Sequence, residues 1–137
     1  MALSKKFITN GFILSGIANI GGVFILSGFL TNEAINRVDP DVMSNFGLVM
    51  ILVWGLAFFA TAKNYDKVRW LVGVYVIEKL VYALNWSFWL TNSNLAEVFE
   101  EDVMAGIFYS IYGVNDWLFF LFFLIVFLQL GKKQGAA

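Results

Sequence analysis

The chain has 137 residues, of which 60% are hydrophobic and 14% are charged, where a soluble domain averages about 25% charged residues. Such a composition cannot cover a water-facing surface, and a net charge of −1 argues against nucleic acid as a partner. The sequence contains no Cys and no His, so we expect no disulfide, no metal and no cofactor.

Four apolar segments follow one another along the chain. Each has the roughly 20 residues that a helix needs to cross a bilayer, and the first is too long for a signal peptide. Because backbone groups in lipid must be satisfied within the segment, we expect helices rather than open strands. The sequence therefore predicts one all-α domain over 1–137, an integral membrane antiparallel four-helix bundle. The predicted helices cover about residues 7–30, 43–62, 70–90 and 103–130.

Three local signals refine these elements. Pro40 follows Asp39 as the first helical residue follows an N-cap, which predicts that the second helix begins there. Asn94, with Glu97 three residues later, predicts a cap that opens a short interfacial turn. The first segment also has a face of small residues, which predicts the close approach of another helix. These residues are Gly11, Ser15, Ala18 and Gly22.

Charged residues separate by sign between the connections. Basic residues precede the first segment, occupy the second connection and follow the fourth segment, whereas the first and third connections are acidic. By the positive-inside rule, both termini and the short middle loop face the cytoplasm, and we expect a bacterial inner membrane. The basic residues are Lys5, Lys6, Lys63, Lys67, Arg69, Lys132 and Lys133.

A repeated pattern relates the two halves of the chain. Leu-Thr-Asn occurs at 30–32 and again at 90–92, and an acidic linker ending in Asp-Val-Met follows each, at 41–43 and 102–104. One interpretation is a duplicated helical hairpin, a parallel repeat with its pseudo-twofold axis along the membrane normal. The alternative is chance, because membrane sequences use few residue types.

A layer of polar residues is predicted at the middle of the bilayer. Glu78 and Lys79 fall near the middle of the third segment, Asp116 near the middle of the fourth and Asn19 at the centre of the first. A charge at that depth costs about 2.5–3.5 kcal/mol, so these side chains should face the bundle interior and pair. We expect Lys79 to pair with Asp116, and Glu78 to form a hydrogen bond with Tyr112 or Asn19.

Helical spacing places further polar and aromatic residues on the same helix faces as the polar layer, which predicts a pocket. Further polar and aromatic residues recur at intervals of three or four on the third and fourth segments. Most lie between the midplane and the outer surface, whereas 117–127 offers only one indole N–H. This favours a blind pocket open to the outer leaflet or the outside. The candidate ligand- or ion-binding residues are Asn19, Tyr75, Glu78, Lys79, Tyr82, Asn85, Trp86, Tyr109, Tyr112, Asn115 and Asp116.

Two interpretations of the charged residues stay open. They could form a structural ion-pair lock, or the carboxyl left over when one base meets two acids could bind a proton or a cation. The leading functional hypothesis is a pocket for an amphipathic or lipid-like ligand, for which a cationic headgroup would suit two acids and one base. Two further hypotheses are a dimeric proton- or cation-coupled transporter and an accessory subunit of a larger membrane complex. Enzymatic activity is poorly supported, since only Glu, Asp, Lys and Tyr could transfer protons.

Several membrane families can be compared with this layout. The fourth segment lacks the Arg residues of a voltage sensor, the first lacks the Glu of small multidrug transporters, and claudin-like Cys pairs are absent. In size, four spans and a polar second hairpin, including the stretch 112–116 (Tyr-Gly-Val-Asn-Asp), the chain resembles small bacterial DoxX-like membrane proteins. The resemblance implies the layout of spans and carries over no catalytic residue.

Overall fold

The chain folds into helices, and no strand occurs among residues 2–135, which are the residues that the computed structural model describes. The side chains of residues 133–135, and with them the predicted basic Lys133, lie outside that description. The predicted all-α class is confirmed. In order, the elements are α1 (Lys5–Leu26), α2 (Glu33–Val38), α3 (Asn45–Thr61), η1 (Tyr65–Lys67), α4 (Arg69–Asn92), α5 (Leu95–Glu101) and α6 (Val103–Gly135).

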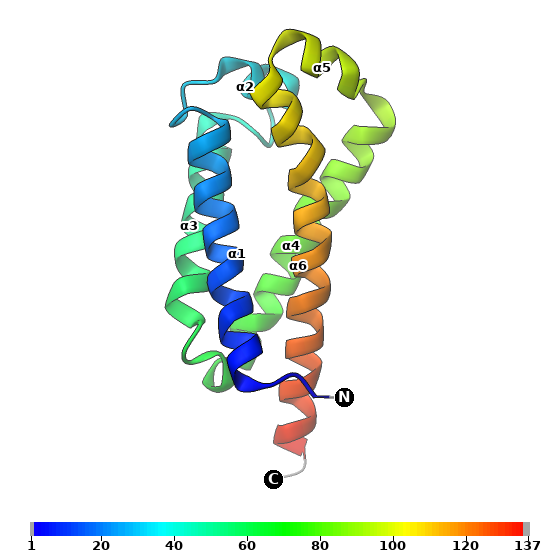
Figure 1. The fold of residues 1–137 in the computed structure, drawn as a ribbon. Coiled ribbons are helices and arrows are strands. Elements are labelled where there is room, and N and C mark those ends of the chain that lie inside the picture. The colour runs from blue at the N-terminus through cyan, green and yellow to red at the C-terminus, as the bar shows by residue number, and fades with distance from the viewer. Residues whose placement is uncertain (1, 136–137) are drawn as a thin grey trace.

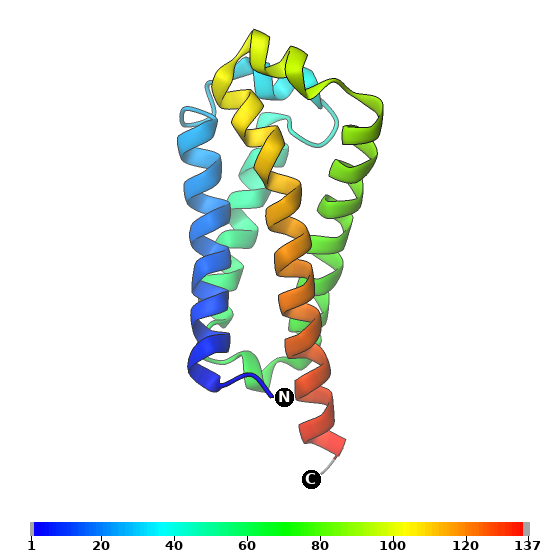
Figure 2. The ribbon, with the colours of Figure 1, turned by 45° about the vertical axis from the view of Figure 1, so that its right-hand side comes forward.

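The long helices run side by side, and the short ones lie across one end. Figure 1 shows α1, α3, α4 and α6 along the length of the molecule, with α2 and α5 at the end opposite the two termini. We call α2, α5 and their flanking turns the cap. Helix α1 packs along α3, and α4 packs along α6, as the rotated view in Figure 2 also shows. Helices α1, α4 and α6 are long and apolar enough to cross a membrane, whereas α3 is a shorter apolar helix of 17 residues.

The first helix ends earlier than the apolar run suggests. Helix α1 stops at Leu26, so the predicted end at Leu30 is wrong. The backbone turns sharply here, with φ values of 54° at Gly28, 57° at Phe29 and 70° at Leu30. The hydroxyl of Ser27 accepts a hydrogen bond from the Leu30 N–H at 2.9 Å, which holds this left-handed turn closed. Gly28 tolerates such a φ value, but the two residues after it do so at a steric cost.

The second long helix begins after the residue predicted to open it. Pro40 lies in a turn, and α3 begins at Asn45. Ser44 is the N-cap, since its hydroxyl accepts a hydrogen bond from the Gly47 N–H at 3.2 Å. The prediction at Pro40 was wrong because Asp39, whose Oδ1 accepts from the Val42 N–H at 3.3 Å, caps only a turn, and Ser44 caps the helix itself.

Asparagine residues cap both short helices. The side chain of Asn94 accepts from the Ala96 N–H at 3.1 Å and donates to Glu97 at 2.9 Å, which confirms the predicted cap of α5. Asn32 accepts from the Ala34 N–H at 3.0 Å in the same way and opens α2, which the sequence reasoning missed. A long–short–long succession of helices therefore occurs twice, and the duplication stays a hypothesis.

Polar contacts join the two halves of the cap. Arg37 on α2 forms an ion pair with Glu101 on α5 at 2.6 Å. Asn32 donates to Asp102 at 2.8 Å, and Asp102 also accepts from the Ala105 N–H at 2.7 Å. The Ala105 N–H and then the Asn32 amide lower the pKa of Asp102 below its ordinary value, because both stabilise the ionised carboxylate.

The apolar interior consists of two separate clusters. On α1, α4 and α6 the residues of the predicted polar layer lie between them. The cap-side core comprises Val23, Ala34, Ile35, Met43, Leu48, Trp89, Val98, Ala105, Phe108, Tyr109 and Tyr112. The terminus-side core comprises Ile8, Phe12, Phe58, Ala62, Tyr65, Val72, Tyr75, Phe123, Val126 and Leu130.

Candidate functional site

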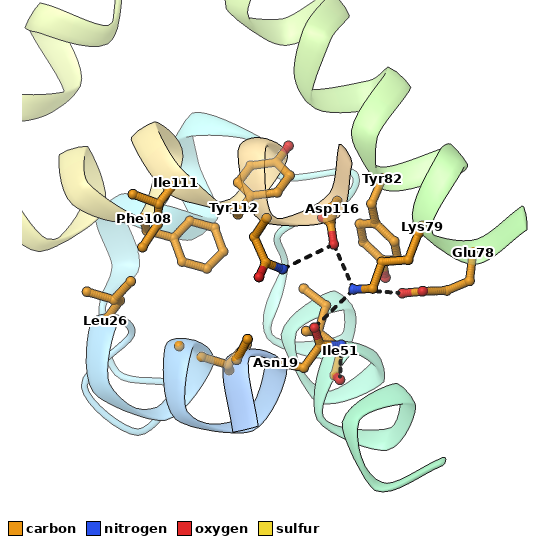
Figure 3. Close-up of a pocket in the computed structure, with 14 residues that line it drawn as sticks. Asn19, Leu26, Ile51, Glu78, Lys79, Tyr82, Phe108, Ile111, Tyr112 and Asp116 are labelled. Atoms are coloured by element: carbon orange, nitrogen blue, oxygen red, sulfur yellow. Dashed lines mark hydrogen bonds and ion pairs between the residues drawn. The ribbon is translucent and has the colours of Figure 1, made fainter. Parts of the chain in front are cut away.

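Three helices contribute to a buried charge cluster between the two cores. The ammonium of Lys79 on α4 is buried and donates to Asp116 Oδ1 on α6 at 2.7 Å. It also donates to Asn19 Oδ1 on α1 at 3.0 Å, as Figure 3 shows. The predicted pairing of Lys79 with Asp116 is therefore present in the structure. The bond to Asn19 means that one lysine connects three helices.

The amide of Asn19 is held in place by α3. Its nitrogen donates to the backbone carbonyl of Ile51 at 3.1 Å, which leaves its oxygen facing Lys79. This contact requires α1 and α3 to lie close together. A Cβ at Gly16 would lie 2.9 Å from the Gly55 carbonyl oxygen, and one at Gly55 would lie 3.2 Å from the Cβ of Asn19. The two glycines thus position Asn19 as an acceptor for the lysine.

An aromatic ring also lies beside the Lys79 ammonium. Lys79 Nζ lies 5.2 Å from the centroid of the Phe58 ring, within the range of a cation–π contact. Phe58 belongs to the terminus-side core, where its ring packs against Tyr75 and Phe123 at centroid distances of 4.9 Å and 5.1 Å. The charge cluster therefore rests on packed aromatic side chains.

Glu78 shares the burial of its neighbours but not their hydrogen bonds. Its side chain is 4% exposed, and neither carboxylate oxygen has a hydrogen-bond partner among residues 2–135. Its nearest charge is Lys79 Nζ, 3.8 Å from Oε1. The predicted hydrogen bond to Tyr112 or Asn19 is wrong. The Asn19 amide is already bound on both sides, and the Tyr112 hydroxyl is likewise unpartnered in the described part of the chain.

Only one carboxylate oxygen of Asp116 accepts a hydrogen bond within residues 2–135. Its hydrogen bonds from Lys79 and from Asn115, at 2.7 Å and 3.5 Å, both go to Oδ1. Among the hydrogen bonds within residues 2–135, only one of the four carboxylate oxygens of Glu78 and Asp116 is therefore an acceptor. The cluster has more acceptors than donors, and with both acids ionised it carries an excess of one negative charge.

A cavity of about 90 Å³ adjoins this cluster. It is bounded by α1, α3, α4 and α6 on the cap side of the lysine. Seven of the predicted site residues line it, namely Asn19, Glu78, Lys79, Tyr82, Tyr112, Asn115 and Asp116. The remaining walls are apolar or small and were not predicted as site residues: Ala18, Gly22, Val23, Leu26, Ile51, Phe108 and Ile111.

The cavity reaches the outside of the helices between α1 and α6. A Cβ at Gly11 would collide with the ring of Phe122 on α6, so the two helices touch there. At Gly22, three turns further along α1, a Cβ would meet nothing within 4 Å, and Ile111 on the facing part of α6 is 50% exposed. The close approach predicted for the whole small-residue face therefore holds at Gly11 and fails at Gly22, because the two helices diverge towards the cap.

Comparison of the chain with known proteins gives no match among family models, curated proteins or solved structures. The resemblance to DoxX-like proteins therefore stays one of span layout. Within residues 2–135, no group of three or more Asp or Glu side chains is arranged to hold a metal ion. The cavity and its charges are the features that bear on function.

Tyr75 does not line the cavity, contrary to the prediction. It is fully buried in the terminus-side core, where its hydroxyl shares a hydrogen bond with Thr61 Oγ1 at 2.6 Å and donates to the Ala57 carbonyl at 3.2 Å. Tyr75 lies almost one turn before Glu78 on α4, so helical spacing gave the correct face of the helix but the wrong side of the charge layer.

Three further predicted wall residues have partners away from the cavity. Asn85 donates to Asp39 at 3.1 Å, and the indole of Trp86 donates to the Tyr109 carbonyl at 2.7 Å. The Tyr109 hydroxyl donates to the Ile35 carbonyl at 2.7 Å. None of the three lines the cavity, because their polar groups are bound by Asp39 and by the backbone of α6 and α2.

The missed wall residues had only weak signals in the sequence. Ala18 and Gly22 belong to the predicted small-residue face, which was interpreted as a helix contact rather than a cavity wall. Phe108 and Ile111 look like any apolar residue of a membrane helix. Only the divergence of α1 from α6 distinguishes them, and that depends on tertiary packing.

Proposed function

We propose that this is an integral membrane protein in which α1, α3, α4 and α6 all cross the bilayer, with both termini on the cytoplasmic side of a bacterial inner membrane. The outward faces of these helices support the proposal. Large apolar side chains are exposed along them, including Phe46 at 77%, Trp70 at 75% and Phe88 at 73%. The distribution of lysine and arginine supports the orientation, since the end that carries the termini is basic and the cap is acidic.

We propose further that the cavity binds a small amphipathic or lipid-like molecule. The observation that carries this proposal is the shortage of hydrogen-bond donors around Glu78 and Asp116. Leaving a buried carboxylate oxygen without a donor costs free energy, so such a group is usually satisfied by something outside the protein chain or serves function at the expense of stability. The remaining walls are apolar, as in most sites for small molecules.

The same geometry disfavours transport through the molecule. Below Lys79 the terminus-side core is filled by aromatic rings, and Phe12 packs against Phe123 and Tyr75 at centroid distances of 5.0 Å and 6.1 Å. A solute or ion in the cavity would have no polar route towards the terminus side. We therefore rank ligand binding above proton- or cation-coupled transport.

Native mass spectrometry of the mildly extracted protein tests this function. We expect the wild type to carry a discrete small-molecule adduct after exposure to total membrane lipid, and Glu78→Gln to lose it. Glu100→Gln is a matched control, because Glu100 is exposed on α5 and makes no hydrogen bond or ion pair within the described residues. It should keep the adduct.

Absence of any adduct on the wild type would overturn the proposal. A second protein retained in the same spectrum, with no small-molecule adduct, would favour the accessory-subunit hypothesis. A dimer whose Glu78→Gln form loses a proton-coupled flux in vesicles would favour the transporter.

A further inference from the structure

We propose that the ligand is a protonated amine carrying one apolar chain, and that it enters sideways from the bilayer between α1 and α6. This inference rests on the proposed binding function and adds to it the chemical class of the ligand and its route. It requires the amine head to lie at Glu78 and Asp116 and the chain to leave past Gly22.

Charge balance selects a cation. Lys79 lies 2.7 Å from Asp116 and 3.8 Å from Glu78, so a single ammonium faces two carboxylates. One more positive charge would make the cluster neutral. An anionic head would add a third negative charge in a buried site, which is strongly unfavourable at low dielectric.

Hydrogen bonding selects an ammonium among the cations. Both oxygens of Glu78 lack a donor within residues 2–135, and Asp116 Oδ2 receives none of the hydrogen bonds found there. A primary ammonium brings three N–H donors. A quaternary ammonium of the same charge brings none, so it would leave these oxygens unsatisfied.

The volume of the cavity favours a ligand with a small head and a single alkyl chain. A volume of about 90 Å³ holds a small head and the first few methylene groups, but not the head of a phospholipid. Leu26, Phe108 and Ile111 form the wall between the charges and the outer surface. A chain in contact with them would continue directly into the hydrocarbon of the membrane.

Packed side chains close the cavity towards both ends of the bundle, which favours entry of the ligand sideways from the bilayer. The cap-side core, which includes Trp89, Tyr109 and Ile35, packs α2 of the cap against α4 and α6 and closes the cavity at that end, and the terminus-side core lies on the other side of the charges. Between α1 and α6, in contrast, the position facing a Gly22 Cβ is open, and Ile111 is half exposed. A ligand dissolved in the outer leaflet reaches the cavity there without unfolding the cap.

The test compares three probes of equal chain length in lipid nanodiscs: dodecylamine, dodecyltrimethylammonium and dodecanol. Binding is measured by native mass spectrometry as the bound fraction at increasing mole fraction of the probe in the bilayer. We expect dodecylamine to bind tightest, by about tenfold or more over either other probe, since a hydrogen bond to a charged group contributes about 1.5–3 kcal/mol. Glu78→Gln should remove that preference.

The route is tested with a matched pair of glycine variants. Gly21→Phe and Gly22→Phe add the same side chain to adjacent positions of α1, and a Cβ at either position meets nothing within 4 Å. Only Gly22 lines the cavity. We expect Gly22→Phe to lose dodecylamine binding and Gly21→Phe to bind as the wild type does.

Each part of the inference can fail separately. Equal binding of dodecylamine and dodecanol, unchanged by Glu78→Gln, would overturn the amine assignment and leave the proposed binding function standing. Equal binding of dodecylamine and dodecyltrimethylammonium would overturn the requirement for N–H donors. Unchanged binding in Gly22→Phe would overturn the sideways route. If none of the probes and no lipid adduct binds, the proposed function fails together with the inference.

Discussion

Lys79 lies 2.7 Å from Asp116, which is 37 positions away in the chain, but 3.8 Å from its sequence neighbour Glu78. Adjacent residues of a helix point about 100° apart, so the Glu78 side chain leaves α4 in a different direction from Lys79. Asp116 faces the Lys79 ammonium from α6 and can approach it directly. The two carboxyls therefore differ in their contacts. Asp116 accepts a hydrogen bond from Lys79 across the helix interface, whereas Glu78 has no hydrogen-bond donor within residues 2–135 and is the carboxyl that we propose depends most on a ligand.

The lock predicts a large and non-additive loss of stability. Asp116→Asn or Lys79→Met alone should each lower the free energy of unfolding by about 3–5 kcal/mol, because the remaining charge stays buried without its partner. The double variant should lose clearly less than the sum of the two. A double-mutant cycle on unfolding in a fixed detergent measures this coupling, and strict additivity would contradict the lock.

Glu78→Gln should have the opposite sign. Its oxygens make no hydrogen bonds within the described residues, so removing the buried charge should raise the free energy of unfolding by about 1 kcal/mol. The same unfolding assay, with Asp116→Asn beside it, checks the sign. A loss of stability as large as that of Asp116→Asn would place Glu78 in the lock as well.

Tyr75→Phe tests the correction to the predicted site. We expect a loss of about 1 kcal/mol from its bonds to Thr61 and the Ala57 carbonyl, with ligand binding unchanged. Thermal unfolding and the nanodisc binding assay give the two values. Loss of binding with unchanged stability would return Tyr75 to the pocket.

Gly113 should be among the glycines of α6 that tolerate substitution least. A Cβ there would collide with the ring of Trp86, whose indole is fixed by the Tyr109 carbonyl at 2.7 Å. Gly113→Ala should therefore cost about 1–3 kcal/mol through overpacking. Gly21→Ala is the control, since its added methyl group meets nothing and should cost nothing in the same unfolding experiment.

Asp102 should make the cap sensitive to acid. Its pKa in the folded protein lies below the ordinary value of 3.8, because the Ala105 N–H and the Asn32 amide stabilise the carboxylate. The resulting stabilisation is present above the unfolded pKa and is lost as the pH falls through the folded pKa. Proteolysis of the cap should increase over that range in the wild type. In Asp102→Asn this pH dependence should be weaker, and an unchanged acid profile would contradict the assignment.

The sequence predicted the parts of this molecule that depend on composition and local spacing. The all-helical class, the burial of the charged residues in the bundle interior, the Lys79–Asp116 pair and the Asn94 cap all follow from hydropathy, cost of burial or a capping pattern. The α1 boundary did not, because hydropathy continues through the Ser27–Gly28 signal that ends the helix. A C-terminal glycine of this kind is a stop signal that outweighs the apolar residues after it.

The site was harder to predict than the fold because spacing gives the face of one helix but not its partner on another. Asn85 and Trp86 lie within a few residues of cavity-lining Tyr82 in the sequence. Their side-chain N–H groups nevertheless donate to Asp39 and to the Tyr109 carbonyl. The cavity itself arises where α1 leaves α6, a divergence that small residues permit but do not encode. Gly11 and Gly22 look alike in the sequence and differ only in what faces them.

The division of the interior into two cores has a consequence for motion. Because the charge layer separates them, we expect the cap-side core to loosen without disturbing the terminus-side core, so that the two behave as separate cooperative units in native-state hydrogen exchange. The amides of α2 and α5 should exchange through openings of lower free energy than those of α4 around Val72 and Tyr75. The terminus-side half would then hold the long helices together, and the cap-side half, which contains the cavity beside Glu78, would open more readily.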